Sequence, residues 1–376
     1  MPKLKAEEKI EEVAMPGSIT VYIGTYTREG GSEGIYRSSL DLKTGALSKP
    51  MLAAKLKSPS FLAIHPSRPL LYAVSETGGD PEEAQALNAF AIDTKTGDLK
   101  HLNSRSTGGG GACHVTVDRS GRVVLAANYS GGSIVSAPIN EDGSLGEVAS
   151  FIQHEGSSVH PQRQKAPHAH SIMVSGDSKF AYSADLGVDK ILIYKLDAAT
   201  GKLTKNPEAP FAKMAPGSGP RHFAFHPNKD FAYVNSEMTS SVSAFKRSPE
   251  TGSLTELQSI STLPKGYKNN NSTAEILVHP SGKFLYCSNR GHDSIAGYAI
   301  GEDGLLAPLG QTPIGGKTPR GFNIDPFGKF LVAGGQNSDS IHVFKIDGES
   351  GALSSVGEPI EVFKPVSVKF FVHVGK

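Results

Sequence analysis

The sequence predicts an all-β fold, a seven-bladed β-propeller of four-stranded antiparallel blades, and two repeated patterns support this prediction. The first pattern is a turn rich in Asp and Asn that ends in Gly-x-Leu. It occurs seven times, at 41–48, 93–100, 140–146, 197–204, 248–255, 301–308 and 347–354. Glycine supplies the positive φ that a tight hairpin needs, and Asp and Asn tolerate turn conformations.

The second pattern is a hairpin of two apolar strands, with His-Pro, Asp-Pro or a similar turn between them. It occurs at 59–76, 112–128, 169–185, 220–237, 273–290 and 319–336. A third strand follows most copies, then the Gly-x-Leu turn and a more polar fourth strand. Four strands in each repeat of roughly 50 residues are typical of a propeller.

The seventh blade is expected to form from both ends of the chain. Residues 365–372 (PVSVKFFV) resemble a first strand with no second strand after it, whereas 18–27 and 34–41 resemble second and third strands without a first. Joining them closes the ring and removes an open sheet edge. We therefore expect one propeller domain over 17–376, preceded by a charged tail at 1–16.

Composition limits the function classes. The formal net charge of +1 does not favour nucleic acid as a partner, and no window approaches ~18 consecutive apolar residues, so no membrane span is expected. Two cysteines are too few for a disulfide framework. A cytoplasmic enzyme fits best, although export after removal of an upstream signal stays open.

The polar ends of the hairpins are the candidate site. In a propeller the first strand of each blade lines the central channel, and its beginning lies at the same face as the end of the second strand. The first-strand positions are Ser60, Cys113, His170, Arg221, Ala274, Arg320 and Val366, followed by Phe61, His114, Ser171, His222, Glu275, Gly321 and Ser367. The second-strand ends are Glu76, Asn128, Asp185, Glu237, Arg290, Gln336 and, from the N-terminal part of the chain, Thr25 and Tyr26.

The chemistry at these positions differs in every blade, whereas the hairpin interiors stay uniformly apolar. We interpret this divergence as the mark of a functional site. The alternative is a solvated propeller face, where charged residues need no function. The long basic connection 154–170 is expected to overhang this mouth, either as a lid or as a plain loop. The histidines of the opposite turns, His65, His226 and His279, are expected to be structural.

Six segments lie in and around the expected blades: YIGTYT (22–27), PSFLAIHPS (59–67), PQRQKAPHAHS (161–171), ADLGVDKILIYKL (184–196), GPRHFAFHPN (219–228) and PRGFNIDPFGKFL (319–331). Together they resemble the seven-bladed lactonase family, which includes the propeller-type 6-phosphogluconolactonases and is similar to the 3-carboxymuconate-lactonizing enzyme. The resemblance implies a catalytic set of His170, Arg221, Glu237 and Arg290, with His168 as the other match for the histidine.

The resemblance implies hydrolysis of a sugar-acid lactone, with 6-phosphogluconolactone opened to 6-phosphogluconate, and no cofactor. His170 or Glu237 would be the base, although Glu237 could instead orient Arg221, and Arg221 or Arg290 would face the carbonyl oxygen. The expected substrate-binding residues are His168, His222, Glu76, Asn128, Asp185, Glu275, Arg320 and Gln336. A metal bound by His168 and His170 is the weaker hypothesis.

Two other functions stay open at this point. One is an enzyme that lactonizes or isomerises a carboxymuconate-like diacid, or hydrolyses an unphosphorylated lactone, with the same arginines. The other is a non-enzymatic propeller that serves as a binding scaffold. In the favoured reading the partner is a small, phosphorylated sugar-acid lactone, with neither nucleic acid nor membrane involved.

Overall fold

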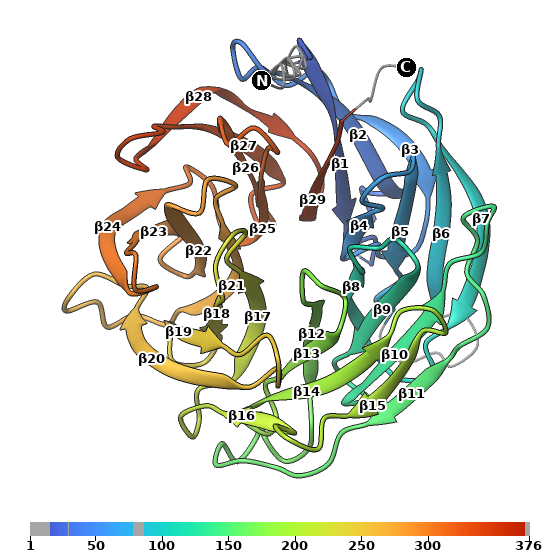
Figure 1. Ribbon diagram of the computed structural model, residues 1–376. Helices are drawn as coiled ribbons and strands as arrows, with labels where there is room; N and C mark the ends of the chain where they lie inside the picture. Colours follow the sequence, from blue (N-terminus) through green and yellow to red (C-terminus); the bar gives the residue numbers. More distant parts are fainter. Residues whose placement is uncertain (1–15, 29, 78–85, 373–376) are drawn as a thin grey trace, which may run out of the picture.

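Seven antiparallel sheets surround a central channel in the computed structural model, which describes residues 16–28, 30–77 and 86–372 (Figure 1). All regular elements among these residues are strands. Each sheet has a path of four strands, and blade 3 carries one additional short strand. The predicted seven-bladed propeller is therefore confirmed. The predicted tail, except for Pro16, lies outside the described residues.

The first three blades follow the order of the chain. Blade 1 contains β4 (Leu62–Ile64), β5 (Leu70–Val74), β6 (Ala86–Ile92) and β7 (Leu99–Ser106). Blade 2 contains β8 (Ala112–Val117), β9 (Val123–Asn128), β10 (Ser133–Pro138) and β11 (Ser150–Gln153). Blade 3 contains β12 (Ala169–Val174), β13 (Phe180–Asp185), β14 (Lys190–Asp197) and β15 (Lys202–Lys205), with β16 (Phe211–Lys213) paired to β14.

The next three blades repeat this arrangement. Blade 4 contains β17 (Pro220–Phe225), β18 (Phe231–Ser236), β19 (Ser241–Arg247) and β20 (Leu254–Ser261). Blade 5 contains β21 (Ser272–Val278), β22 (Phe284–Arg290), β23 (Ser294–Ile300) and β24 (Leu306–Pro313). Blade 6 contains β25 (Pro319–Ile324), β26 (Phe330–Gly335), β27 (Ser340–Ile346) and β28 (Leu353–Glu361).

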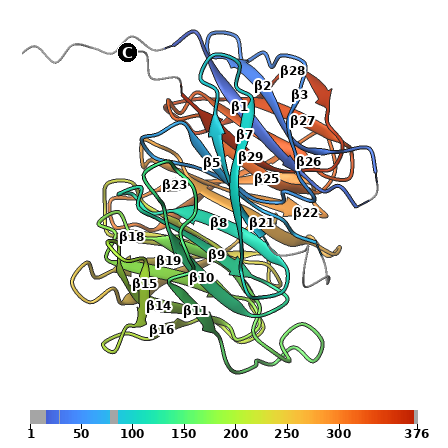
Figure 2. The ribbon, with the colours of Figure 1, turned by 90° about the vertical axis from the view of Figure 1, so that its right-hand side faces the viewer.

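Blade 7 closes the ring from both ends of the chain. Its strands are β29 (Pro365–Phe371), β1 (Ser18–Thr25), β2 (Gly34–Asp41) and β3 (Met51–Lys55). β29 pairs antiparallel with β1, with Val368 opposite Ile23. Figure 1 and the view in Figure 2 both place β29 beside β1. The closure predicted from the sequence is therefore confirmed.

The hydrophobic core lies between neighbouring blades. Successive side chains of a strand point to opposite faces of the sheet. In β1, Val21 accordingly packs with Val332 of blade 6, whereas Tyr22 packs with Leu71 of blade 1. Each blade thus buries one face against each neighbour, which explains the apolar hairpin interiors.

The repeated Gly-x-Leu turn also connects adjacent blades. The Tyr22 hydroxyl donates to the Gly97 carbonyl of the next blade at 2.8 Å. Equivalent bonds join Tyr72 to Gly143, Tyr182 to Gly252, Tyr233 to Gly304 and Tyr286 to Gly351. His65, His226 and His279 likewise contact carbonyls of the following blade, those of Gly121, Gly282 and Gly328. The structural role expected for these histidines is confirmed.

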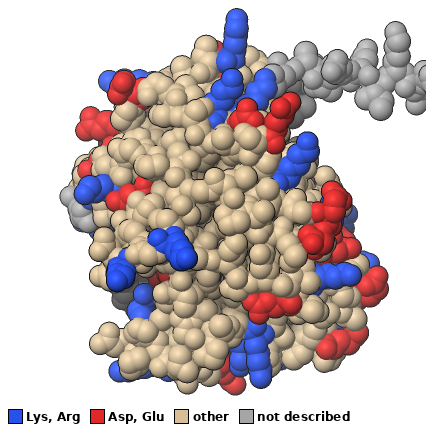
Figure 3. Space-filling view, turned by 90° about the vertical axis from the view of Figure 1, so that its left-hand side faces the viewer, with Lys and Arg blue, Asp and Glu red and all other residues tan. Residues whose placement is uncertain are grey.

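The outer surface shows no dominance of one sign of charge on the side drawn in Figure 3, where Lys, Arg, Asp and Glu are interspersed. In the described part of the chain, no helix is long and apolar enough to cross a membrane.

Candidate active site

Six of the seven inner strands carry a β-bulge close to their first residue, the exception being β4 of blade 1. In β12, Ala169 pairs with Asp185 and Ser171 with Ala184, so His170 is an additional residue. Comparable register shifts occur at Cys113, at Arg221 and His222, at Ala274 and Glu275, at Arg320 and at Val366. A bulge re-aims a side chain that would otherwise follow the alternation of its strand. The chemically variable positions of the sequence are therefore bulge positions.

Glu237 is the centre of the cluster at the channel mouth. Arg221 Nε donates to its Oε2 at 3.0 Å, and Arg290 Nη2 forms an ion pair with the same oxygen at 3.0 Å. Arg163 Nη2 donates to its Oε1 at 2.7 Å. His170 Nε2 lies 3.8 Å from Oε2. The structure thus brings together the four residues predicted as catalytic and adds a third guanidinium, that of Arg163.

The three guanidinium groups determine the charge state of Glu237. Burial by itself raises the pKa of this carboxyl group, but the charges of Arg290 and Arg221 and the bond from Arg163 lower the pKa to about 2. Glu237 is therefore ionised at neutral pH and holds its proton too weakly to be an effective base. Its geometry is that of a residue that orients arginines.

Positive charge exceeds negative charge at the mouth. Glu237 neutralises one of its three arginines, and Arg320 lies nearby with its guanidinium carbon 5.5 Å from the centre of the Tyr26 ring. Among the described residues, Arg320 has no carboxylate within 4.0 Å. Burial and the adjacent Arg221 lower the pKa of Arg290 to about 9, so it keeps its proton at neutral pH. An anionic ligand would relieve this repulsion.

His170 is a neutral imidazole beside these cations. Its Nδ1 lies 3.7 Å from Cys113 Sγ, and its ring centre lies 5.1 Å from that of Tyr129. Burial, followed by the charge of Arg221, holds the pKa of His170 well below its ordinary value. Because the ring is unprotonated at neutral pH, it is able to accept a proton.

The long connection before β12 reaches the mouth as expected. Arg163 donates to the Tyr129 hydroxyl at 2.9 Å in addition to Glu237. His168 stacks on the Tyr129 ring, with 4.6 Å between ring centres, and its Nδ1 lies 2.9 Å from the Tyr129 carbonyl oxygen. The connection therefore supplies one side of the site.

A family model, "Lactonase, 7-bladed beta-propeller", matches residues 20–370. The chain belongs to the seven-bladed β-propeller lactonase family. It is 39% identical to a 6-phosphogluconolactonase of Bacillus subtilis, over 94% of this chain and 98% of that protein. A 6-phosphogluconolactonase of Formosa agariphila is 32% identical over 94% of this chain and 99% of the relative.

Solved structures agree with this assignment to the lactonase family. A putative 6-phosphogluconolactonase from Bacteroides fragilis has a TM-score of 0.87 and 34% identity, with 95% of this chain and 98% of that chain covered. A periplasmic gluconolactonase from Pseudomonas aeruginosa has a TM-score of 0.89 and 30% identity, with 95% and 100% covered.

Two residues expected to bind substrate in this lactonase-family chain have structural roles instead. Asp185 is buried, its Oδ2 lies 2.7 Å from His154 Nδ1, and its Oδ1 accepts from the backbone of His168. Asn128 is also buried and donates to Thr107 O and Ser133 Oγ. Sequence alignment placed both at strand ends but could not show that the connecting loops cover them.

Two further expected residues lie at the rim. Glu76 accepts a 2.9 Å bond from the Tyr26 hydroxyl, close to Arg320 over the same ring. Gln336 is half-buried at the end of the second strand of blade 6, and in the part of the chain that the structure describes its side chain has no bond to the Glu237 cluster.

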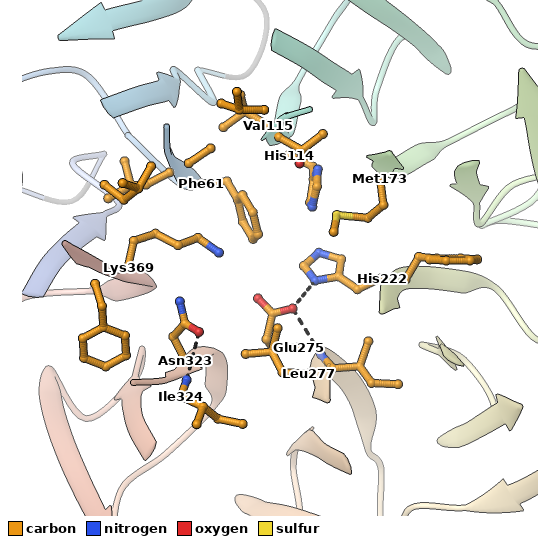
Figure 4. Close-up of a pocket in the computed structure, with 18 of the residues that line it drawn as sticks. Phe61, His114, Val115, Met173, His222, Glu275, Leu277, Asn323, Ile324 and Lys369 are labelled. Atoms are coloured by element: carbon orange, nitrogen blue, oxygen red, sulfur yellow. Dashed lines mark hydrogen bonds and ion pairs between the residues drawn. The ribbon is translucent and has the colours of Figure 1, made fainter. Parts of the chain in front are cut away.

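His222 and Glu275 line a different space. They face a cavity of about 320 Å³, together with Phe61, His114 and Lys369 (Figure 4). This cavity begins directly behind the mouth residues and forms the far end of the channel. Pro326, in a turn at the far end of the hairpins, also lines this cavity. Direct substrate contact by these two residues, as expected from the sequence, stays a prediction; the His222 ring centre lies 5.5 Å from that of His170. A bulge carries two successive side chains toward the channel, and the second one lines this cavity.

The part of the chain that the structure describes offers no additional ligands for a metal bound by His168 and His170. Within the described ranges, no group of three or more His, Cys, Asp and Glu side chains could hold a metal ion. The sequence analysis also missed Arg163 and Tyr129 as mouth residues. The basic character of 154–170 was the available signal for Arg163, whereas Tyr129 follows a strand end and carried no signal of its own.

Proposed function

We propose that this chain hydrolyses a sugar-acid lactone at the channel mouth, with 6-phosphogluconolactone as its substrate and 6-phosphogluconate as the product. The observation that carries the proposal is a buried carboxylate, Glu237, bonded to three arginines beside a neutral histidine. This arrangement combines a base with excess positive charge. Family membership and the names of the relatives support the same reaction class.

His170 is the proposed general base. Its unprotonated ring takes a proton from a water molecule while the water oxygen attacks the lactone carbonyl carbon. The ring C–O bond then breaks, and the imidazolium returns the proton to the departing ring oxygen. His170 fits this role better than Glu237 because both oxygens of Glu237 accept hydrogen bonds from guanidinium groups, whereas His170 Nε2 lies 3.8 Å from Glu237 Oε2.

Arg221 and Arg290 are the proposed partners of the developing oxyanion. Arg221 uses Nε for Glu237 and Nη1 for His222 and Ala274, and Arg290 uses Nη2 for Glu237 and Thr273. No acceptor among the described residues forms a hydrogen bond with Arg221 Nη2 or Arg290 Nη1. Fixed donors of this kind stabilise charge as it develops in the transition state. Glu237 is accordingly proposed as a positioning residue.

The phosphate of the substrate is proposed to lie against Arg320, with Arg163 as a second contact. Arg320 is held over Tyr26 without a carboxylate partner in the described chain, and Arg163 is 42% exposed, so both present charge to the mouth. Guanidinium groups match phosphate oxygens with paired donors. Glu76, His168 and Gln336 remain proposed contacts for sugar hydroxyls at the rim.

The test is a comparison of three substrates, 6-phosphogluconolactone, gluconolactone and carboxymuconate, with spontaneous turnover subtracted. The proposal expects the highest kcat/KM with the phosphorylated lactone. A preference for gluconolactone would retain the reaction and remove the phosphate contact. Turnover of carboxymuconate alone would replace hydrolysis by lactonization. Absence of all three activities would contradict an enzymatic role and favour a binding scaffold.

A further inference from the structure

Arg221 is held from two sides. Its side chain is 2% exposed, and on the mouth side its Nε donates to Glu237. On the opposite side its Nη1 donates to His222 Nε2 at 3.0 Å and to the Ala274 carbonyl. A guanidinium has only donors, so His222 Nε2 must present its lone pair. The contact with Arg221 thereby defines which nitrogen of His222 carries hydrogen.

The same argument extends to Glu275. Because Nε2 of the neutral ring is the acceptor, Nδ1 carries the hydrogen and donates to Glu275 Oε1 at 2.7 Å. The backbone N–H of Ile276 donates to the same oxygen at 3.1 Å, which marks it as an unprotonated acceptor. Burial, followed by the charge of Arg221, keeps the pKa of His222 well below its ordinary value, in agreement with a neutral ring.

We infer that His222 and Glu275 are positioning residues that fix the guanidinium of Arg221 from the far end of the channel. Glu275 selects the Nδ1–H form of His222, and that form gives Arg221 an acceptor. In the other tautomer, the Nε2–H would meet an N–H of Arg221, so two donors would oppose each other. The inference rests on the proposed role of Arg221 in lactone hydrolysis. It adds that residues outside the mouth hold Arg221 in place for that role.

Glu275 variants test the inference through kcat and KM. Glu275→Leu removes the acceptor, and we expect kcat to fall about tenfold with KM little changed, because a transition-state contact is misplaced. Glu275→Gln retains an acceptor oxygen, and we expect it to restore most of kcat. His114→Phe is the matched control, since His114 lines the same cavity and its ring centre lies 4.3 Å from that of Phe61, but it has no bond to Arg221.

A double-mutant cycle connects the effect to Arg221. In an Arg221→Gln background, Glu275→Leu is expected to lower kcat no further, because its target is gone. An equal loss in both backgrounds, or unchanged kcat in Glu275→Leu, would overturn the inference.

The histidine tautomer gives a readout that does not depend on activity. In ¹⁵N NMR, His222 of the unaltered protein should show a protonated Nδ1 and an unprotonated Nε2, and Glu275→Leu should lose this pattern. A protonated Nε2 in the unaltered protein would overturn the inference even if lactonase activity is present. If the protein shows the expected tautomer but has no lactonase activity, the positioning of Arg221 by His222 is supported and only the proposed reaction is contradicted.

Discussion

The two ends of the central channel each contain a buried glutamate, and the two carboxyl groups behave in opposite ways. Glu237 at the mouth and Glu275 at the far end are 6% and 5% exposed, so burial is nearly equal. The pKa of Glu237 is lowered to about 2, whereas burial raises the pKa of Glu275 above its ordinary value. Glu237 bonds to three guanidinium groups, whereas Glu275 bonds to one neutral histidine and a backbone amide.

The comparison teaches that the two ends are built for different tasks. At the mouth, cations outnumber carboxylates and His170 stays neutral, which suits an anionic substrate and a base. At the far end, Lys369 lies 4.5 Å from the centre of the Phe61 ring, and Glu275 holds His222 rather than a cation. We therefore expect the reaction to take place at the mouth, and we expect residues at the far end to position the mouth residues.

The largest expected effect comes from the histidine at the mouth. His170→Gln removes the proposed base, and kcat should fall about 10²- to 10⁴-fold because general base catalysis is lost. The measurement is initial lactone hydrolysis corrected for the spontaneous rate. His114→Gln, at the other end of the channel, is the control and should retain activity. Similar kcat values for the two variants would remove His170 from the mechanism.

The next effect distinguishes the two glutamates by acid unfolding. The folded-state pKa of Glu237 is lowered from 4.5 to about 2, so its ionisation stabilises the fold above pH 4.5 by about 3 kcal/mol, and this is lost as the pH falls toward 2. Glu275 has a raised pKa, so its ionised form costs stability at neutral pH and protonation relieves this cost.

Urea unfolding of Glu237→Gln and Glu275→Gln between pH 6 and pH 3 measures this difference. The stability gap between the unaltered protein and Glu237→Gln should shrink on acidification. Relative to Glu275→Gln, the unaltered protein should gain stability over the same range. Parallel curves for the two variants would show that the two carboxyl groups do not differ as described.

The fold and the ring of mouth positions could be predicted from the sequence because both depend on repetition. Seven turns and six hairpins reveal the blades, and the alignment of hairpins identifies the positions that diverge, among them Arg221 and Arg320. The alignment does not show where a side chain points. His222 follows Arg221 directly, yet only Arg221 bonds to Glu237 at the mouth, whereas His222 lines the cavity on the other side of the Arg221 guanidinium.

Contacts that come from outside the repeat were the hardest to predict. Arg163 lies in an irregular connection and reaches Glu237 across 74 residues of sequence. Asp185 and Asn128 looked like exposed strand ends, but the loops that enter their blades cover them. The sequence repeats thus predict the propeller scaffold, whereas the connecting loops decide which strand-end positions are accessible to substrate.

A smaller effect concerns the cations at the two ends. Arg320→Met should raise KM for the phosphorylated lactone about tenfold, because a charge-assisted contact of about 1.5 kcal/mol is lost, and should leave KM for gluconolactone nearly unchanged. Lys369→Met, at the far end, is the control and should alter neither value. An equal rise of KM for both substrates in Arg320→Met would contradict a phosphate contact at this residue.

The smallest expected effect is a change in the pH dependence of the same variant. Burial first, and then the charges of Arg221 and Arg320, hold the pKa of His170 below its ordinary value. Removing the Arg320 charge makes the imidazolium less unfavourable, so the pKa of His170 should rise toward its ordinary value. The acid limb of kcat with gluconolactone should therefore move to higher pH in Arg320→Met and stay in place in Lys369→Met. A limb that moves to lower pH, or moves equally in both variants, would show that the mouth cations do not set the proton affinity of the base.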